Sequence, residues 1–281
     1  PSGPEYTTMR RLPVRAYVPV AALLFAAWLP VLALDPRRAV TEYGHDVWQD
    51  SLPQGTVHAV VQTRDGYLWL GTYEGLVRFN GVEFVVFDKQ NTPQFKNNGI
   101  RTLFEDRNGT LWIGTASGGV VALAGGVFTA YGTEQGLAND FVYAITEDAE
   151  GVVWVGTNGG LSRFSNGVFQ RFGKAEGLPS DRIRALWPAR GGALWIGTDA
   201  GLCVLRDERV TTFGVAEGPP SGSVTALRED REGGIWVGTD GGGLSVYRDG
   251  RFTTFTSEAG LSSNRVWALY EDRYGSLWIG T

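Results

Sequence analysis

Leu68-Trp69-Leu70-Gly71-Thr72 is the stretch of sequence that decides the fold, because its phrase Trp-x-Gly-Thr returns five more times. The tryptophans of the six copies are Trp69, Trp112, Trp154, Trp195, Trp236 and Trp278. Successive tryptophans lie 41 to 43 residues apart. A repeat of ~40–45 residues is typical of a propeller blade, which is a sheet of four short strands. The sequence therefore predicts an all-β fold, a β-propeller of four-stranded blades in which these tryptophans are structural.

Each repeat can be divided into four short strands. The first strand ends at a turn with Asp at its first and Gly at its fourth position, as in Asp106-Arg107-Asn108-Gly109. This is type I turn chemistry, in which the carboxylate accepts hydrogen bonds from its own backbone. The second strand carries Trp-x-Gly-Thr, and its Gly is expected to leave room for the adjoining blade. A two-residue hairpin such as Asn80-Gly81 joins the third and fourth strands, although the fourth copy has Asp207-Glu208 there.

The linkers between blades share a Gly-Leu pair, as in Gly136-Leu137. Each linker runs from an outermost strand to the innermost strand of the next blade, so the linkers should gather on one face of the propeller, near its axis. The fourth copy departs from the pattern, because Trp187-Pro188-Ala189-Arg190 replaces Glu-Asp before the turn and the linker becomes Glu217-Gly218-Pro219-Pro220. Pro188 should end its strand, since proline cannot donate a hydrogen bond to a sheet.

The two ends of the propeller region carry predictions about ring closure. Glu42 to Leu52 resembles a fourth strand and a linker, as expected where an N-terminal strand completes the last blade. The sixth copy reaches Thr281 after only its second strand. We therefore expect residues 34–281 to form a partial propeller of five full blades and half of a sixth, truncated at its C-terminal end.

The start of the chain resembles an export signal. Residues 1–8 carry no pattern, and residues 9–33 combine a positive first part, an apolar run over 16–32 and small residues before a cleavage point after Ala33. The alternative is a retained N-terminal membrane anchor, since a span needs ~17–25 apolar residues. Either way, the residues after Asp35 are predicted to lie outside the cytoplasm.

Composition excludes several classes of function. A net charge of −5 argues against a general nucleic-acid binder, whose affinity depends on Lys and Arg. The single cysteine, Cys203, excludes an intramolecular disulfide framework and a Cys-rich metal site, and its strand pattern predicts a small buried apolar residue. The sequence indicates no cofactor and no metal site.

One consensus runs through the copies: Asp-x-x-Gly-x-Leu-Trp-Ile-Gly-Thr, then Gly-Leu, and one strand later Gly-Leu-Pro or Gly-Leu-Ser. This consensus resembles the two-component regulator propeller repeat. The resemblance covers Glu42 to Thr281. It implies the periplasmic sensor region of an inner-membrane receptor, with seven-bladed rings, a cytoplasmic histidine kinase or diguanylate cyclase output domain and a homodimeric full-length protein. Attachment to the membrane would use segments outside these residues or an uncleaved N-terminus.

An enzymatic function finds little support in the residues. The chain has two histidines, His45 and His58, and it lacks a Gly-x-Ser-x-Gly elbow and a glycine-rich phosphate loop before a helix. We therefore predict no catalytic residue and no enzyme activity within this chain. The alternative function is a secreted propeller lyase, whose blades have a similar Gly-x-Leu-Trp phrase and whose chemistry would require His and acidic residues at the ring centre.

The positions that vary while the scaffold repeats are the candidates for binding. They are the second residue of each innermost strand and the residues just before it. Aromatic rings mixed with Arg, Asp and Asn suit a small polar ligand such as an oligosaccharide. The alternative is that these residues pack between blades or face solvent, and packing is the alternative above all for the two aromatic members. The residues predicted to bind a ligand at this axial mouth are His58, Arg101, Asp140, Tyr143, Asp181, Arg184, Asn264, Arg265 and Trp267.

Overall fold

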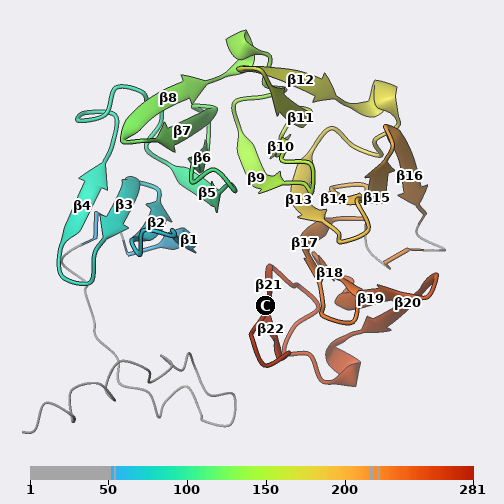
Figure 1. Ribbon diagram of the computed structural model, residues 1–281. Helices are drawn as coiled ribbons and strands as arrows, with labels where there is room; N and C mark the ends of the chain where they lie inside the picture. The colour runs from blue at the N-terminus through green and yellow to red at the C-terminus, as the bar shows by residue number, and fades with distance from the viewer. Residues whose placement is uncertain (1–51, 54, 215–217, 220–221) are drawn as a thin grey trace, which may run out of the picture. The chain divides into compact units, whose positions relative to one another are not determined.

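The computed structural model describes residues 52–53, 55–214, 218–219 and 222–281, which belong to one compact unit, Asp46–Thr281. These residues form twenty-two strands in six antiparallel sheets, five of four strands and one of two (Figure 1). The all-β propeller with five full blades and half of a sixth is thereby confirmed. The predicted export signal, His45 and most of the Glu42–Leu52 segment lie outside the described residues.

Every full blade is a meander in which each strand pairs with the one before it. Blades 1 and 2 consist of β1 (Val57–Gln62), β2 (Leu68–Thr72), β3 (Gly75–Phe79), β4 (Phe84–Phe87), β5 (Ile100–Glu105), β6 (Leu111–Thr115), β7 (Val120–Ala124) and β8 (Val127–Tyr131). Blades 3 and 4 consist of β9 (Val142–Glu147), β10 (Val153–Thr157), β11 (Gly160–Ser165), β12 (Val168–Phe172), β13 (Ile183–Pro188), β14 (Leu194–Thr198), β15 (Gly201–Arg206) and β16 (Arg209–Phe213). Blade 5 and the two-stranded sheet consist of β17 (Val224–Glu229), β18 (Ile235–Thr239), β19 (Leu244–Arg248), β20 (Arg251–Phe255), β21 (Ala268–Glu271) and β22 (Leu277–Gly280). As predicted, β13 ends at Pro188.

The sheets stand side by side along an open arc, and their first strands lie on its inner side (Figure 1). Because each blade is a meander, the linkers and the loops after Trp-x-Gly-Thr lie at one end of the strands. We call this end the linker face. The Asp-x-x-Gly turns and the two-residue hairpins lie at the other end, the turn face. Short 3-10 turns, η4 (Thr133–Gln135), η5 (Lys174–Glu176) and η6 (Ser257–Ala259), shape three of the linkers.

The glycine of Trp-x-Gly-Thr is where one blade packs on the next. A Cβ at Gly114 would lie 2.6 Å from Cγ1 of Val142, the first residue of the following blade. In the same way, a Cβ at Gly156 would lie 2.7 Å from Cγ2 of Ile183, the first residue of blade 4. Val142 and Ile183 are fully buried. The predicted role of the glycine is therefore confirmed, since a side chain here would occupy the place of the neighbouring blade.

The tryptophan of the motif is tied to the turn that precedes it. In blade 2, Trp112 Nε1 donates to Asp106 Oδ2 at 2.8 Å, while Asp106 Oδ1 accepts from the backbone N–H groups of Asn108 and Thr110 at 2.9 Å. Blades 3 and 5 and the two-stranded sheet repeat the indole–carboxylate bond. In blade 1 the hydroxyl of Thr63 accepts from its tryptophan instead, at 3.1 Å. One carboxylate thus closes the turn and anchors the buried indole.

A second contact between blades lies on the turn face and was not anticipated from the sequence. Arg107, next to the turn Asp, reaches the following blade, where its Nε lies 2.6 Å from Glu147 Oε1 and its Nη2 donates to the carbonyls of Asp148 and Ala149. Equivalent contacts, which we call the Arg–Glu latch, are made by Arg64, Arg190 and Arg231 with Glu105, Glu229 and Glu271. The Glu side chains are largely buried, so the latch satisfies charges that burial would otherwise make costly.

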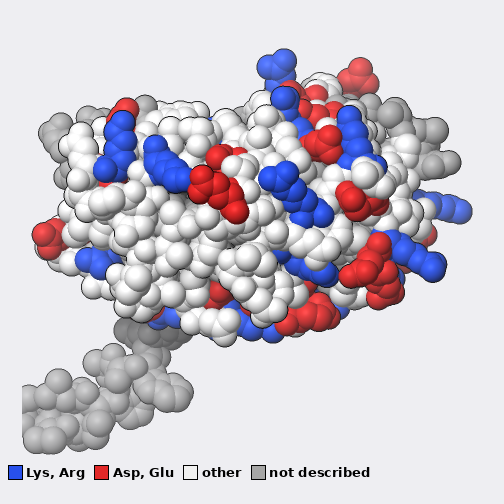
Figure 2. Space-filling view, turned by 90° about the horizontal axis from the view of Figure 1, so that it is seen from above, with Lys and Arg blue, Asp and Glu red and all other residues white. Residues whose placement is uncertain are grey.

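Three further features concern the buried cysteine, the surface charges and the helices of the described chain. Cys203 is fully buried, and desolvation raises the pKa of its thiol to about 12, as expected of a packing residue. Figure 2 shows Lys and Arg interspersed with Asp and Glu on the outer edge of the blades, without a field of one sign. In the part of the chain that the structure describes, no helix has the length and apolar character needed to cross a bilayer.

Candidate ligand-binding site

The second residue of each innermost strand is the extra residue of a β-bulge. The pairing register shifts between Ile100 and Thr102 in β5, and an equivalent shift occurs at the start of β1, β9, β13 and β17. The first residue of the strand, such as Ile100, is fixed against the glycine of the preceding blade. A bulge re-aims the next side chain without disturbing the rest of the ladder. The variable second residues singled out in the sequence are therefore bulged positions at the linker-face ends of the innermost strands.

Three of these bulge residues and one neighbour form a stack of alternating cations and rings. The guanidinium of Arg101 lies 5.1 Å from the ring centre of Phe141 and 5.5 Å from that of Tyr143. The guanidinium of Arg184, which belongs to the next blade, lies 5.6 Å from the ring centre of the same Tyr143. The two rings are 4.8 Å apart. We call Arg101, Phe141, Tyr143 and Arg184 the cation–π ladder, and it joins blades 2, 3 and 4 on the linker face.

The ladder begins in blade 1 with an aromatic pair. His58 meets the ring of Tyr73 edge-on at 4.1 Å, and Arg101 Nη1 donates to the Tyr73 hydroxyl at 3.5 Å. Desolvation by burial, followed by the charge of Arg101, lowers the pKa of His58, so its imidazole is neutral at pH 7. Arg101 Nε is buried and has no hydrogen-bond partner within the described residues. This nitrogen is thus an exception to the rule that buried polar groups are hydrogen-bonded.

The ladder ends in blade 4 with a carboxylate. Arg184 Nε donates to Asp199 Oδ1, and Arg182 Nη1 donates to Asp199 Oδ2 at 2.8 Å. The hydrogen bond to Asp199, more than its charge, raises the pKa of Arg184. Arg182 is held further by Asn158, whose Oδ1 accepts from its Nε at 2.6 Å. The guanidinium groups at this end are thus fixed before any ligand arrives, which reduces the entropy lost on binding.

The predicted residues that precede the innermost strands face back into their own linkers. Asp140 Oδ1 accepts from the backbone N–H of Thr133 at 3.0 Å, and Asp181 and Asn264 make the same contact with Lys174 and Ser257. Their side chains hold the linker in shape, and a contact with ligand stays a prediction for them. Arg265 pairs with Asp240 at 3.3 Å, and Trp267 is half-exposed at the start of the two-stranded sheet, so neither joins the ladder.

Tyr73 and Asp199 contribute to the site and were missed by the sequence reasoning. Both directly follow the Thr of Trp-x-Gly-Thr, a position that varies as strongly as the bulge residue. Its occupants are Tyr73, Ala116, Asn158, Asp199 and Asp240. The signal was therefore present in the sequence, one residue beyond the end of the conspicuous phrase.

A hollow of about 350 Å³ opens on the linker face beside Tyr73. The residues lining it are Tyr73, Glu74, Lys89, Lys96, Asn97, Asn98, Gly99 and Ala116. Its volume lies at the lower end of the ~300–1,000 Å³ that small-molecule sites occupy. In the described part of the chain no three His, Cys, Asp or Glu side chains gather as metal ligands would. The hollow and the ladder together offer rings, amides and cations.

Comparison with known families and structures identifies the repeat. The sequence profile described as "Two component regulator propeller" matches residues 51–74, 94–117, 136–159, 218–241 and 260–281. No curated protein sequence matches the chain.

Among solved structures, the chain is similar to the extracellular domain of BT3049, assigned to a hybrid two-component system of B. thetaiotaomicron, at 25% identity and a TM-score of 0.73 over 84% of this chain and 34% of that one. The extracellular domain of BT4673 from B. thetaiotaomicron is 24% identical with a TM-score of 0.65, over 83% of this chain and 33% of that one. Virginiamycin B lyase from Staphylococcus aureus shares the fold, at 13% identity and a TM-score of 0.64, over 79% of this chain and 76% of that one. The chain thus spans about a third of the length of the two B. thetaiotaomicron structures.

Repeat profile, blade geometry and these structural likenesses agree with the resemblance seen in the sequence. Five of the six Trp-x-Gly-Thr repeats thus match the two-component regulator propeller repeat.

Proposed function

We propose that the chain is the ligand-sensing propeller region of a bacterial membrane signalling receptor, located outside the cytoplasm. The observation that carries this proposal is the cation–π ladder, which stands at bulged positions that the repeat leaves free. The repeat profile and the likeness to the extracellular domain of a hybrid two-component system support the sensor role and the extracytoplasmic location. In the whole receptor, ligand binding here would be transmitted to a cytoplasmic histidine kinase or diguanylate cyclase domain, in a homodimer.

The chemistry of the ladder favours a polar, ring-bearing ligand such as an oligosaccharide. Rings like Phe141 and Tyr143 offer flat apolar faces, and the guanidinium of Arg101 lies beside them. Because the ladder joins three blades, a ligand that lies across it would contact all three at once. Binding would then oppose relative movement of the blades, and this is how we propose that occupancy is coupled to the rest of the receptor.

The alternative of a secreted lyase gains no support beyond the shared fold. Virginiamycin B lyase is 13% identical to this chain, a likeness that carries the propeller architecture only. His58, the histidine within the described residues, meets the ring of Tyr73 edge-on, and its pKa is lowered first by desolvation and then by the charge of Arg101. We therefore retain the sensor as the function to test.

Thermal-shift screening of the purified chain against neutral and acidic oligosaccharides tests the proposal. A ligand present at 100 times its Kd stabilises the folded state by about 2.7 kcal/mol, which a melting curve resolves. Tyr143→Ala and Arg101→Ala are expected to abolish the shift produced by a stabilising oligosaccharide, because they remove a ring and a guanidinium of the ladder.

Arg209→Ala, an exposed arginine at the turn-face hairpin of blade 4, is the matched control and should leave the shift unchanged. A stabilising oligosaccharide whose shift survives both ladder substitutions would place the binding site elsewhere.

A further inference from the structure

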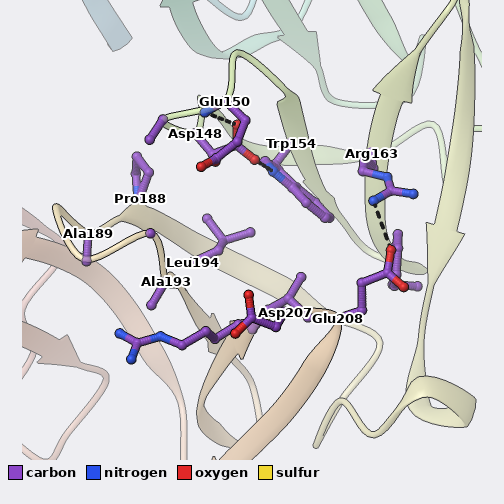
Figure 3. A pocket seen from close by; sticks show the side chains of 15 residues that line it. Asp148, Glu150, Trp154, Arg163, Pro188, Ala189, Ala193, Leu194, Asp207 and Glu208 are labelled. Carbon is purple, nitrogen blue, oxygen red and sulfur yellow. Dashed lines mark hydrogen bonds and ion pairs between the residues drawn. The ribbon is translucent and has the colours of Figure 1, made fainter.

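A second hollow, of about 290 Å³, lies on the turn face between blades 3 and 4 (Figure 3). Its floor is formed by Trp154, Leu194 and Leu205, which are buried. Its rim carries exposed carboxylates on opposite sides, Glu150 from the turn of blade 3 and Asp207 from the hairpin of blade 4 (Figure 3). The site thus combines an apolar base with an anionic rim.

This hollow exists because the Arg–Glu latch is missing at this junction. Between blades 2 and 3, Arg107 crosses the gap to Glu147 and to carbonyl groups of the following turn. The residue equivalent to Arg107 in blade 3 is Ala149, and the residue equivalent to Glu147 in blade 4 is Pro188. Both halves of the latch are therefore lost together, and both replacements line the hollow.

The hairpin at the rim departs from the repeat in a way that costs conformational energy. Other blades place glycine at the second hairpin position, as at Gly167 with φ 83°. Blade 4 has Glu208 there with φ 60°, preceded by Asp207 with φ 49°. A left-handed backbone is unfavourable for glutamate, because its Cβ lies too close to the backbone. The hairpin that places two carboxylates at the rim is therefore less stable than one with glycine at its second position.

The charges around the hollow are only partly compensated. Glu208 pairs with Arg163 at 3.4 Å, and Arg163 lies over the rings of Trp154 and Phe172 at 5.9 and 5.5 Å. The side-chain oxygens of Glu150 and Asp207 make no ion pair or hydrogen bond with any described residue. Arg206 is the other cation that lines the hollow, against four carboxylates in all, so the net charge of the lining is negative.

We propose that this hollow is a binding site for a small organic cation, one with a guanidinium, amidinium or amine group on an apolar body. The cation takes the place that the latch arginine occupies at the neighbouring junctions. Its charged end lies between Glu150 and Asp207, and its body packs on Trp154 and Leu194. The volume limits the ligand to about the size of one amino acid, since it falls just below the ~300 Å³ at which drug-sized sites begin.

Isothermal titration of the purified chain with benzamidine, against its uncharged isostere benzamide, tests the proposal. Benzamidine is expected to bind saturably, and benzamide at least tenfold more weakly, because the amide has the same shape but lacks the positive charge and carries an acceptor oxygen in place of a donor. Neutralising the rim in the double variant Glu150→Gln and Asp207→Asn should weaken benzamidine at least tenfold. Glu232→Gln, at the equivalent turn position of blade 5 where Arg231 supplies the latch, should leave the affinity within a factor of two.

Two further variants separate a binding role from a structural one. Ala149→Arg should abolish binding by filling the hollow as Arg107 does elsewhere. Glu208→Gly should raise the melting temperature, since it relieves the left-handed glutamate, and yet weaken benzamidine, since it releases the charge of Arg163. Equal binding of benzamidine and benzamide, no saturable benzamidine binding at millimolar concentration, or a double variant indistinguishable from Glu232→Gln would overturn the proposal.

Discussion

Gly114→Ala is expected to lower the free energy of unfolding by about 1–3 kcal/mol, the range found when a methyl group is forced into a packed core. The new Cβ would lie 2.5 Å from Thr102 Cγ2 and 2.6 Å from Val142 Cγ1. Both neighbours are β-branched, so neither can rotate its methyl group away freely. Denaturant unfolding of the purified variant and of the unsubstituted chain measures the difference.

Gly280→Ala is the control, because it changes the same motif position in the last copy. There the nearest atom to a new Cβ is Ala268 Cβ at 3.3 Å, and no residue of a following blade is among its neighbours. The control is expected to cost well under 1 kcal/mol, in line with ordinary substitutions outside a packed contact. Equal losses for Gly114→Ala and Gly280→Ala would show that the motif glycine serves its own strand and not the packing between blades.

Asp106→Ala should destabilise the chain by about 3 kcal/mol, since each unsatisfied buried donor costs about 1–3 kcal/mol. The carboxylate is buried and accepts from the Trp112 indole and from two backbone N–H groups of its turn. Asp106→Thr copies the arrangement of blade 1, in which Thr63 accepts from Trp69, and should recover about 1 kcal/mol of the loss. The free energies of unfolding of the two variants provide the measurement, and identical values would contradict the role assigned to the indole bond.

The scaffold was predictable from the sequence because each of its parts repeats. Six copies of Trp-x-Gly-Thr, the Asp-x-x-Gly turns and the hairpin glycines each specify a local conformation. Because these elements return every 41 to 43 residues, they predict a β-propeller of four-stranded blades. The strands, their order and the packing role of Gly71 and Gly114 could therefore be stated before any coordinates.

The Arg–Glu latch could not be derived in the same way. Arg107 and Glu147 are 40 residues apart, and each looks like an ordinary charged residue of an exposed turn until the blades are placed side by side. The hollow between blades 3 and 4 could not be predicted for the same reason. The sequence does not connect Ala149 with Pro188, and only the arrangement of the blades shows that together they replace one latch.

The candidate binding residues could be predicted from the sequence only in part. Their variability pointed to Arg101, Tyr143 and Arg184, and each of them is a bulged residue at the start of an innermost strand. Variability alone did not separate them from Asp140, whose carboxylate is engaged by the linker backbone. A short polar side chain before a strand can serve a ligand or its own loop equally well, and only the hydrogen-bond geometry distinguishes the two.

Hydrogen–deuterium exchange with and without a stabilising oligosaccharide tests the central claim, that the repeat is scaffold and the free positions of the linker face bind ligand. The account predicts that protection is gained at the starts of β5, β9 and β13 and in the loops after Trp-x-Gly-Thr, with no change in the Asp-x-x-Gly turns. Protection confined to the turn face, or the failure of every neutral and acidic oligosaccharide to stabilise the chain, would contradict it.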